Sequence, residues 1–445
     1  MTRLLADRYN VRGRFQRSTR IDRGDDPHSE LDGFILHETG RQIISRLFNS
    51  AGQNSQRAFT WTGPYGSGKS TLALYLAHLL GVDKKQKKIA KSVFGLKQLP
   101  EVLQPFCKTT GRWLVVRVTG SREDSLKAIW QALQSAIGEY WDSNTPSSVK
   151  NLREPTNYDE LVDQLLAVGK AAAKANRGVG LFLMADEMGR LLENAAQSGG
   201  SLHLFQEIAE RFSRSTAPCI FLGILHQSFQ EYAGQIDRDR RNEWAKIQGR
   251  FEDTPFNVSI NEALSLLGRA IKGDPPEKVS RQIAKEVAST VHSPRFGDEK
   301  SFIAAVQNCY PLHPLSALLL PSIARQKFGQ NERSLFSFLA SGEPGGFREY
   351  LTATEDTETA PTYLPDRLWD YLDLNLQQVI LASPVGHRWS EALEAVERAT
   401  RGTELHLRLT KIIALLDLFG RPFTLHATQN LLLSTFEKQS RKKVK

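Results

Sequence analysis

The sequence predicts an α/β fold with a parallel five-stranded sheet that is covered by helices on both faces and followed by an all-helical part. Two observations support this prediction. Between residues 57 and 259, short apolar stretches alternate with longer segments of helical spacing, as in parallel sheets whose strands are buried on both faces. From residue 261 onward, apolar residues recur only at intervals of three and four, which is typical of helices.

The first part is expected to contain five strands with helices between them. Each expected strand is a short apolar run, and each expected helix has its apolar residues on one side. The strands are predicted at 57–62, 113–118, 179–185, 218–225 and 254–259. The helices are predicted at 70–80, 125–140, 158–175 and 202–214.

The second part is expected to contain helices only. They are predicted at 261–271, 276–292, 298–308 and 316–328, and a last helical segment at 368–436. Residues 342–365 are rich in Gly, Pro, Thr and acids, and we interpret them as a linker. Within the last segment, two helices flank Gly420-Arg421-Pro422. This pair is either the start of a winged helix or ordinary helix packing.

A phosphate-binding motif, G-x-x-x-x-G-K-[ST], lies between the first strand and the first helix. Glycines in such a loop let backbone N–H groups turn toward phosphate oxygens, and the N-terminus of the following helix adds partial positive charge. Lys69 is expected to reach the β- and γ-phosphates of ATP, and Ser70 to hold Mg²⁺. The residues predicted to bind the nucleotide are Gly63, Pro64, Tyr65, Gly66, Ser67, Gly68, Lys69, Ser70 and Thr71. An ordinary Gly-rich turn is the alternative.

An acid pair, Asp186 and Glu187, follows the apolar third strand. An apolar run that ends in Asp-Glu is the Walker B pattern of nucleotide-hydrolysing proteins. Asp186 is expected to hold Mg²⁺ through a water molecule, and Glu187 to polarise the attacking water as a general base. The alternative is a strand that ends in two surface acids.

Polar residues also close the fourth strand, which is expected to lie between the strand before the phosphate loop and the strand before the acid pair. A polar side chain at its tip would reach the γ-phosphate or the attacking water. Gln227 is a candidate for this role, as are His226 and Ser228. The alternative is that these are loop residues with local hydrogen bonds.

Two arginines are candidates for stabilising charge in the transition state. Arg250 lies in a Gly-Arg-Phe turn before the fifth strand and is expected to project into the nucleotide site of a neighbouring subunit. Arg333, with Arg325 as second choice, is expected to touch the γ-phosphate from the helical part. The alternatives are a surface charge for Arg250 and an ion pair with a nearby acid for Arg333.

Composition limits the class of protein. The chain has 445 residues, of which 40% are hydrophobic and 24% charged, so it can bury a sizeable core. It contains no run of eighteen apolar residues and no apolar signal segment at its start, so we expect a cytoplasmic protein with no membrane span. The formal net charge is +9, with basic clusters at 1–23, 84–97 and 441–445. These clusters either hold a polyanion such as DNA or form a solvated basic face.

Together these motifs resemble those of AAA+ P-loop ATPases, over residues 50–345. The order of elements is similar to the origin-recognition and STAND-like branches. More narrowly, several segments resemble the large ATPases of bacterial phage-defence islands, such as those of BREX systems. These segments are RFQRSTRIDRG, LDGFILHETGRQIISRLF, DEMGRLLENA, LHLFQEIAERFSRS, LHQSFQEYA, EWAKIQGRFED and YPLHPLSALLLPSIARQKFGQNERSLFSFL.

The resemblance implies four parts and a function. Residues 1–50 would wrap the nucleotide site, 51–260 form the ATPase core, 261–345 a helical lid, and 346–445 a linker with a C-terminal helical domain. The protein would be an oligomeric, Mg²⁺-dependent ATPase of antiviral defence that acts on or near DNA, with an effector or partner protein from the same operon. The alternative is a STAND-like switch that assembles on ATP binding with little turnover. A helicase motor is disfavoured because no second strand–helix alternation follows residue 260.

Overall fold

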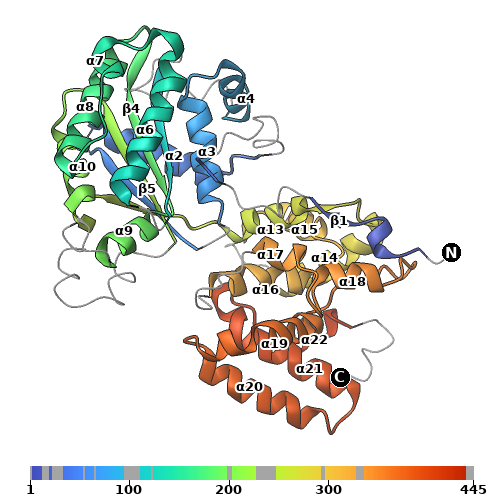
Figure 1. The fold of residues 1–445 in the computed structure, drawn as a ribbon. Coiled ribbons are helices and arrows are strands. Elements are labelled where there is room, and N and C mark those ends of the chain that lie inside the picture. Colours follow the sequence, from blue (N-terminus) through green and yellow to red (C-terminus); the bar gives the residue numbers. More distant parts are fainter. Residues whose placement is uncertain are drawn as a thin grey trace. The chain divides into compact units, whose positions relative to one another are not determined.

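The computed structural model describes residues 3–12, 20–22, 34–53, 56–64, 67–94, 111–121, 124–197, 203–226, 247–291, 296–326 and 335–436. The chain divides into two compact units (Figure 1). We call Thr19–Asn257 the sheet unit, and Met1–Ser18 with Val258–Lys445 the helical unit. The predicted division into four parts stays a prediction. In the structure, Met1–Ser18 belongs to the helical unit rather than to the sheet unit.

A five-stranded parallel sheet forms the centre of the sheet unit, which confirms the predicted α/β fold. Its strands are β2 (Ala58–Thr62), β3 (Arg112–Thr119), β4 (Gly178–Asp186), β5 (Cys219–Leu225) and β6 (Glu252–Pro255). Their spatial order is β3-β4-β5-β2-β6. The strand before the acid pair, β4, is therefore separated from the strand before the phosphate loop, β2, by β5 alone, as predicted.

Helices cover both faces of this sheet. Every residue of β2 and of β5 is buried, and because successive side chains of a strand point to opposite faces, both faces must be covered. The helices of the sheet unit are α2 (Glu38–Gln53), α3 (Lys69–Leu80), α4 (Lys84–Phe94), α6 (Ser125–Trp141), α7 (Ser147–Lys150), α8 (Tyr158–Lys174), α9 (Met188–Gln197) and α10 (His203–Arg214). Helices α6 and α8 pack on β3 and β4, and α10 packs on β5 (Figure 1).

Two elements of the sheet unit differ from the prediction. The fifth strand ends at Pro255 rather than at Ser259, because the Ser259 side chain caps the next helix and accepts a hydrogen bond from the amide of Glu262. The lysine run at 84–97 begins with the helix α4, which Asp83 caps at its N-terminus. Lys87 of this helix donates to the carbonyls of Leu80 and Gly81, so one lysine of the run closes the preceding helix.

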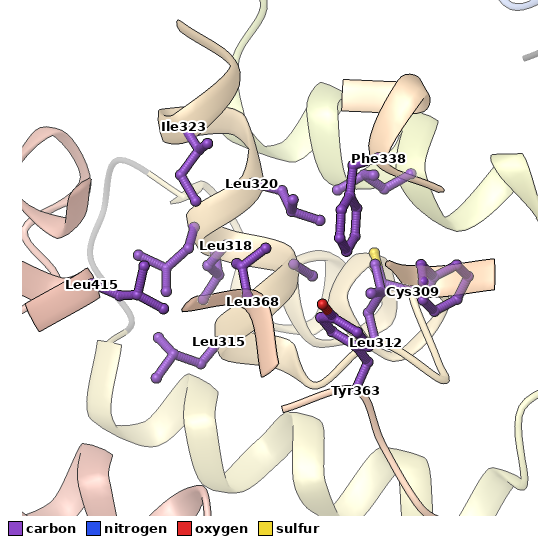
Figure 2. Close-up of a cluster of buried hydrophobic side chains, with 14 of the residues drawn as sticks. Cys309, Leu312, Leu315, Leu318, Leu320, Ile323, Phe338, Tyr363, Leu368 and Leu415 are labelled. Carbon is purple, nitrogen blue, oxygen red and sulfur yellow. The ribbon is translucent and has the colours of Figure 1, made fainter. Parts of the chain in front are cut away.

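Among the described residues of the helical unit there are two short strands, and the other regular elements are helices. Strands β1 (Asn10–Val11) and β7 (Ile271–Lys272) pair antiparallel and join residues 3–12 to the rest of the unit. The helices are α13 (Ile260–Ala270), α14 (Glu277–Val291), α15 (Glu299–Gln307), α16 (Pro314–Arg325), α17 (Leu335–Ala340), α18 (Phe347–Ala353), α19 (Pro365–Leu381), α20 (Gly386–Ala399), α21 (Glu404–Leu415) and α22 (Gln429–Ser434). Figure 2 shows part of their common core, in which Leu318 of α16, Leu368 of α19 and Leu415 of α21 gather.

The stretch 342–365, which we interpreted as a linker, is part of this core. It contains α18, and Phe347, Tyr350 and Tyr363 are buried. The Tyr363 hydroxyl donates to the carbonyls of Gly345 and Arg367, which ties the stretch to the start of α19. The many Gly, Pro and acidic residues indicated a linker, although these three buried aromatic residues hold the stretch in the core.

The helix pair around Gly420 also has packing contacts. A π-helical turn (Leu416–Gly420) and a 3-10 turn (Arg421–Phe423) follow α21, and α22 then packs against α14 with Leu431 buried. These contacts favour the interpretation as ordinary helix packing. Within the described residues, no helix is long and apolar enough to cross a membrane.

Candidate functional site

The phosphate-binding motif connects β2 to α3. Gly68 caps α3 with φ of 94°, in the left-handed region that favours glycine. A Cβ atom on Gly63 would lie 2.9 Å from the Phe256 carbonyl oxygen, so this position also requires glycine. Ser70 and Thr71 lie in the first turn of α3. Tyr65 and Gly66 lie outside the described residues.

Lys69 lies in the phosphate loop with its side chain buried; the residue is only 3% exposed. Its ammonium donates to the Gly63 carbonyl at 2.5 Å, to the Pro64 carbonyl at 2.7 Å and to the Ser67 hydroxyl at 3.3 Å. An ammonium has three donors, and the loop satisfies them. The positive charge is therefore held where the loop would surround a phosphate.

Ser70 and Asp186 meet at the edge of the sheet where the strands end. The Ser70 hydroxyl donates to Asp186 Oδ1 at 3.1 Å. Burial raises the pKa of Asp186 to about 6, although the hydrogen bonds from Ser70 and from the Glu187 amide act in the opposite direction. Within the described part of the chain, no three His, Cys, Asp or Glu side chains form a metal cluster. Mg²⁺ typically takes one or two protein ligands beside phosphates and water, so the Ser70 and Asp186 oxygens fit it.

Glu187 lies in a tight turn directly after β4. Its φ of 50° is in the left-handed region, which is uncommon for a residue with a side chain. Its carboxylate forms an ion pair with Arg190 at 2.8 Å. Gly120, directly after β3, donates its amide to the Asp186 carbonyl at 2.7 Å, and a Cβ there would lie 2.2 Å from the Glu187 carbonyl oxygen. The end of β3 thus fixes the backbone of the acid pair.

His226 follows β5, between the phosphate loop and the acid pair. It is 8% exposed, and burial, with the nearby charges of Lys69 and Arg190, lowers its pKa to about 2. The imidazole is therefore neutral at physiological pH. Gln227 and Ser228, the other candidates for this tip, lie outside the described residues.

Arg250 does not join this cluster within its own chain. It precedes β6, whose first residue Glu252 is opposite Phe59 and whose last residue is opposite Thr62. Arg250 therefore lies at the amino edge of the sheet, a strand length of roughly 17 Å from the loop, which exceeds the reach of its side chain. Its guanidinium forms an ion pair with Glu210 at 2.9 Å.

Of the two candidate arginines in the helical part, the structure describes only Arg325. Arg333 lies outside the described residues, so its role stays a prediction. Arg325, the second choice, donates to the Val258 carbonyl at 2.6 Å and stacks over the Phe423 ring. These contacts within the helical unit tie α16 to residues on either side of it and give Arg325 a structural role.

No protein-family model matches the chain, and no curated protein matches it. Among solved structures, the chain is similar to the ORC2 protein of Aeropyrum pernix in its ADPNP–ADP complexes. The two chains share 14% identity over 79% of this chain and 74% of that chain, with a TM-score of 0.34. A likeness of this size carries no argument about function, which must come from the site itself.

Four residues at the site had no assigned role in the sequence analysis. Arg20 pairs with Asp22 at 2.7 Å, and Asp22 accepts a hydrogen bond from the Thr119 hydroxyl at 2.8 Å. Thr119 lies opposite Asp186 in the pairing of β3 with β4. Arg190 is the fourth. The sequence offered two signals for these residues. Thr119 is a polar residue at the end of β3, and Arg190 is an arginine three positions after Glu187.

Proposed function

We propose that the protein binds ATP with Mg²⁺ and hydrolyses it, as an ATPase of the AAA+ class. The observation that carries the proposal is the hydrogen bond between Ser70 and Asp186, because these are the two residues that the motifs assign to the metal. Lys69 directly precedes Ser70 at the phosphate loop. Glu187 directly follows Asp186 in the turn after β4. A cation for phosphate, two oxygen ligands and a carboxylate base are the groups that phosphoryl transfer to water needs.

Each residue has a distinct task in this reaction. Lys69 binds the β- and γ-phosphate oxygens, and Ser70 with Asp186 would hold Mg²⁺, which neutralises developing charge on the phosphates. Glu187 accepts a proton from the attacking water while that water oxygen bonds to the γ-phosphorus. The bond from the γ-phosphorus to the bridging oxygen breaks, and ADP leaves with its electron pair. The neutral His226, or Gln227 beside it, orients the water or the γ-phosphate.

The strand order agrees with the ATPase core that the motifs predict. The sequence motifs require one strand between the loop strand and the acid strand, and β5 occupies that position. A helical unit follows the sheet, as the resemblance implies.

We further propose a cytoplasmic homo-oligomer in which Arg250 acts on the nucleotide of a neighbouring subunit, since it cannot reach the nucleotide of its own subunit. A defence role on or near DNA, with a partner protein from the same operon, is the finer proposal.

Measuring ATP turnover against protein concentration tests this function. The wild type should hydrolyse ATP in the presence of Mg²⁺, with a rate per subunit that rises as subunits assemble. Glu187→Gln should bind ATP and fail to turn it over. The STAND-like switch is the second candidate, favoured by the ion pair that engages the Glu187 carboxylate. ATP binding with a negligible rate at every concentration, with and without DNA, would support the switch and contradict the ATPase.

A further inference from the structure

The helix α4 presents several lysines to solvent. Its eleven residues include five lysines and no acid. Lys84, Lys85 and Lys88 are exposed, and within the part of the chain that the structure describes none of them pairs with an acid. The carboxylate of Asp83, directly before the helix, accepts hydrogen bonds from the amides of Lys85 and Gln86. The exposed side of α4 therefore carries a strong positive charge.

A fourth lysine of the helix, Lys87, fixes α4 beside the beginning of β3. Its ammonium donates to the carbonyls of Gly81, at the end of α3, and of Gly111, directly before β3. The amide of Arg112, the first residue of β3, donates to the carbonyl of Arg177 at 2.9 Å. Helix α4 therefore lies at the amino edge of the sheet, beside the turn that precedes β4.

The same edge of the sheet carries further positive charge. The Arg112 guanidinium lies over the Tyr140 ring, 4.8 Å from its centroid. Lys174, at the end of α8, and Arg177, in the following turn, are exposed, and neither pairs with an acid among the described residues. These residues lie at the opposite end of β3 and β4 from the acid pair, a strand length of about 25 Å away. We name this surface the basic edge, which consists of Lys84, Lys85, Lys88, Arg112, Lys174 and Arg177.

The chemistry of the basic edge fits the backbone of duplex DNA. Lysine and arginine charges gathered on one surface bind phosphates and release counterions. Surfaces for single strands stack bases on aromatic side chains, but no aromatic residue lies among the lysines in the sequence 84–93. A helix that binds a membrane inserts an exposed apolar face. The apolar side of α4 packs on α3 instead, since Ala90 is buried and its carbonyl accepts from the Tyr75 hydroxyl at 2.8 Å.

We propose that the basic edge binds the phosphate backbone of duplex DNA without reading its sequence. The choice of DNA as the polyanion rests on the proposed function, which this inference deepens by naming the surface that meets the duplex. DNA and ATP would then bind at opposite edges of one sheet. Loss of the α4 lysines therefore weakens DNA binding and leaves ATP turnover in the absence of DNA unchanged.

The affinity for a short duplex of random sequence, measured by fluorescence anisotropy at several salt concentrations, tests this inference. The main variant combines Lys84→Gln, Lys85→Gln and Lys88→Gln, because glutamine forms helix about as well as lysine. Its dissociation constant at about 50 mM salt should rise at least tenfold, and the slope of log affinity against log salt should become shallower by up to about 3. A second variant, with arginine at the same three positions, keeps the charge and should bind like the wild type.

A matched control removes the same charge from the helical unit. Lys278, Arg281 and Lys285 are exposed on α14, and changing all three to glutamine lowers the net charge equally. This control should keep the wild-type affinity and salt slope. Arg177→Gly tests the turn of the basic edge: the φ of Arg177 is 58°, which glycine adopts readily, so the fold should be kept. The salt slope should become shallower by about 1.

The outcomes separate the two proposals. A wild type that does not bind duplex DNA would overturn the inference, and so would an α4 glutamine variant with the wild-type affinity and salt slope. An equal loss in the α14 control would overturn it too, because net charge would then set the affinity. Tighter binding of a single strand than of the duplex would contradict the choice of ligand. A wild type that binds DNA through α4 and never hydrolyses ATP would refute the ATPase and leave the basic edge intact.

Discussion

The Ser70 hydroxyl donates a hydrogen bond to Asp186 over 3.1 Å, although the two residues come from separate motifs. Ser70 lies in the first turn of α3, which follows β2, and Asp186 ends β4, with β5 between the two strands. The parallel sheet brings them together because the carboxyl ends of its strands share one edge. The predictions below test the chemistry that this contact implies.

The buried Asp186 should make stability depend on pH. Its pKa is about 6 in the folded chain, against an ordinary value of 3.8. Between these values the folded state binds more protons than the unfolded state, so stability falls as pH rises, and the full loss is present above about pH 6. Asp186→Asn removes this loss and should raise the free energy of unfolding of the nucleotide-free protein at pH 8, by up to about 3 kcal/mol.

Denaturant unfolding at pH 8 and at the lowest pH where the protein folds reversibly checks this effect. The difference between Asp186→Asn and the wild type should shrink at the lower pH, where the wild-type carboxyl is protonated as well. A variant that is less stable than the wild type at pH 8 would show that the charged Asp186 stabilises the fold.

Loss of the loop cation should abolish tight ATP binding. Lys69→Ala removes a buried ammonium that the loop already orients, and hydrogen bonds to charged groups are worth about 1.5–3 kcal/mol each. We expect the dissociation constant for ATP, measured by fluorescence titration, to rise at least about tenfold. Lys84→Ala, at an exposed position of α4, is the matched control and should bind ATP normally. Equal affinities for wild type and Lys69→Ala would exclude Lys69 from the phosphate site.

Two glycines should respond oppositely to alanine. A Cβ atom at Gly120 would lie 2.2 Å from the Glu187 carbonyl oxygen. A Cβ atom at Gly138, an exposed residue of α6, would have no atom beyond its own stretch of helix within 4 Å. Gly120→Ala should therefore destabilise the fold by about 1–3 kcal/mol and lower ATP turnover. Gly138→Ala should stabilise it by about 0.5–1 kcal/mol, because alanine favours helix. Thermal unfolding of both variants measures these changes in stability. An unchanged stability of Gly120→Ala would mean that the turn at the acid pair tolerates movement.

Arg250 should act between subunits. Arg250→Ala should leave ATP affinity unchanged and lower turnover strongly, by about a thousandfold at the magnitude known for arginine fingers. Mixing it with Lys69→Ala should restore part of the activity, because some interfaces then combine an intact loop with an intact arginine. Arg214→Ala, which removes a second arginine paired with Glu210, is the control. A mixture as inactive as its components would argue against action in trans.

The sequence predicted the sheet well because its strands are local signals, whereas the roles of the motif residues stay predictions. The apolar runs that became β2 and β5 are buried at every position, and such strands are recognisable without their neighbours. The sequence assigned Ser70 and Asp186 to one metal ion, and their hydrogen bond is a finding of the structure.

The parts that could not be predicted depend on contacts between distant residues. Nothing near Arg190 in the sequence distinguishes a pair with Glu187 from a solvated charge, since both suit a helix start. The pairing of Asp22 with Thr119 joins residues 97 positions apart. The aromatic anchors of 342–365 were hidden in a polar composition, because burial of Tyr363 depends on helices on either side of it.

The affinity for a non-hydrolysable ATP analogue, measured with and without Mg²⁺, tests the central claim most directly. If Ser70 and Asp186 hold the metal, Mg²⁺ should tighten binding of the analogue to the wild type, and this gain should be lost in both Ser70→Ala and Asp186→Asn. An equal gain in all three proteins, or no binding by the wild type, would contradict the account.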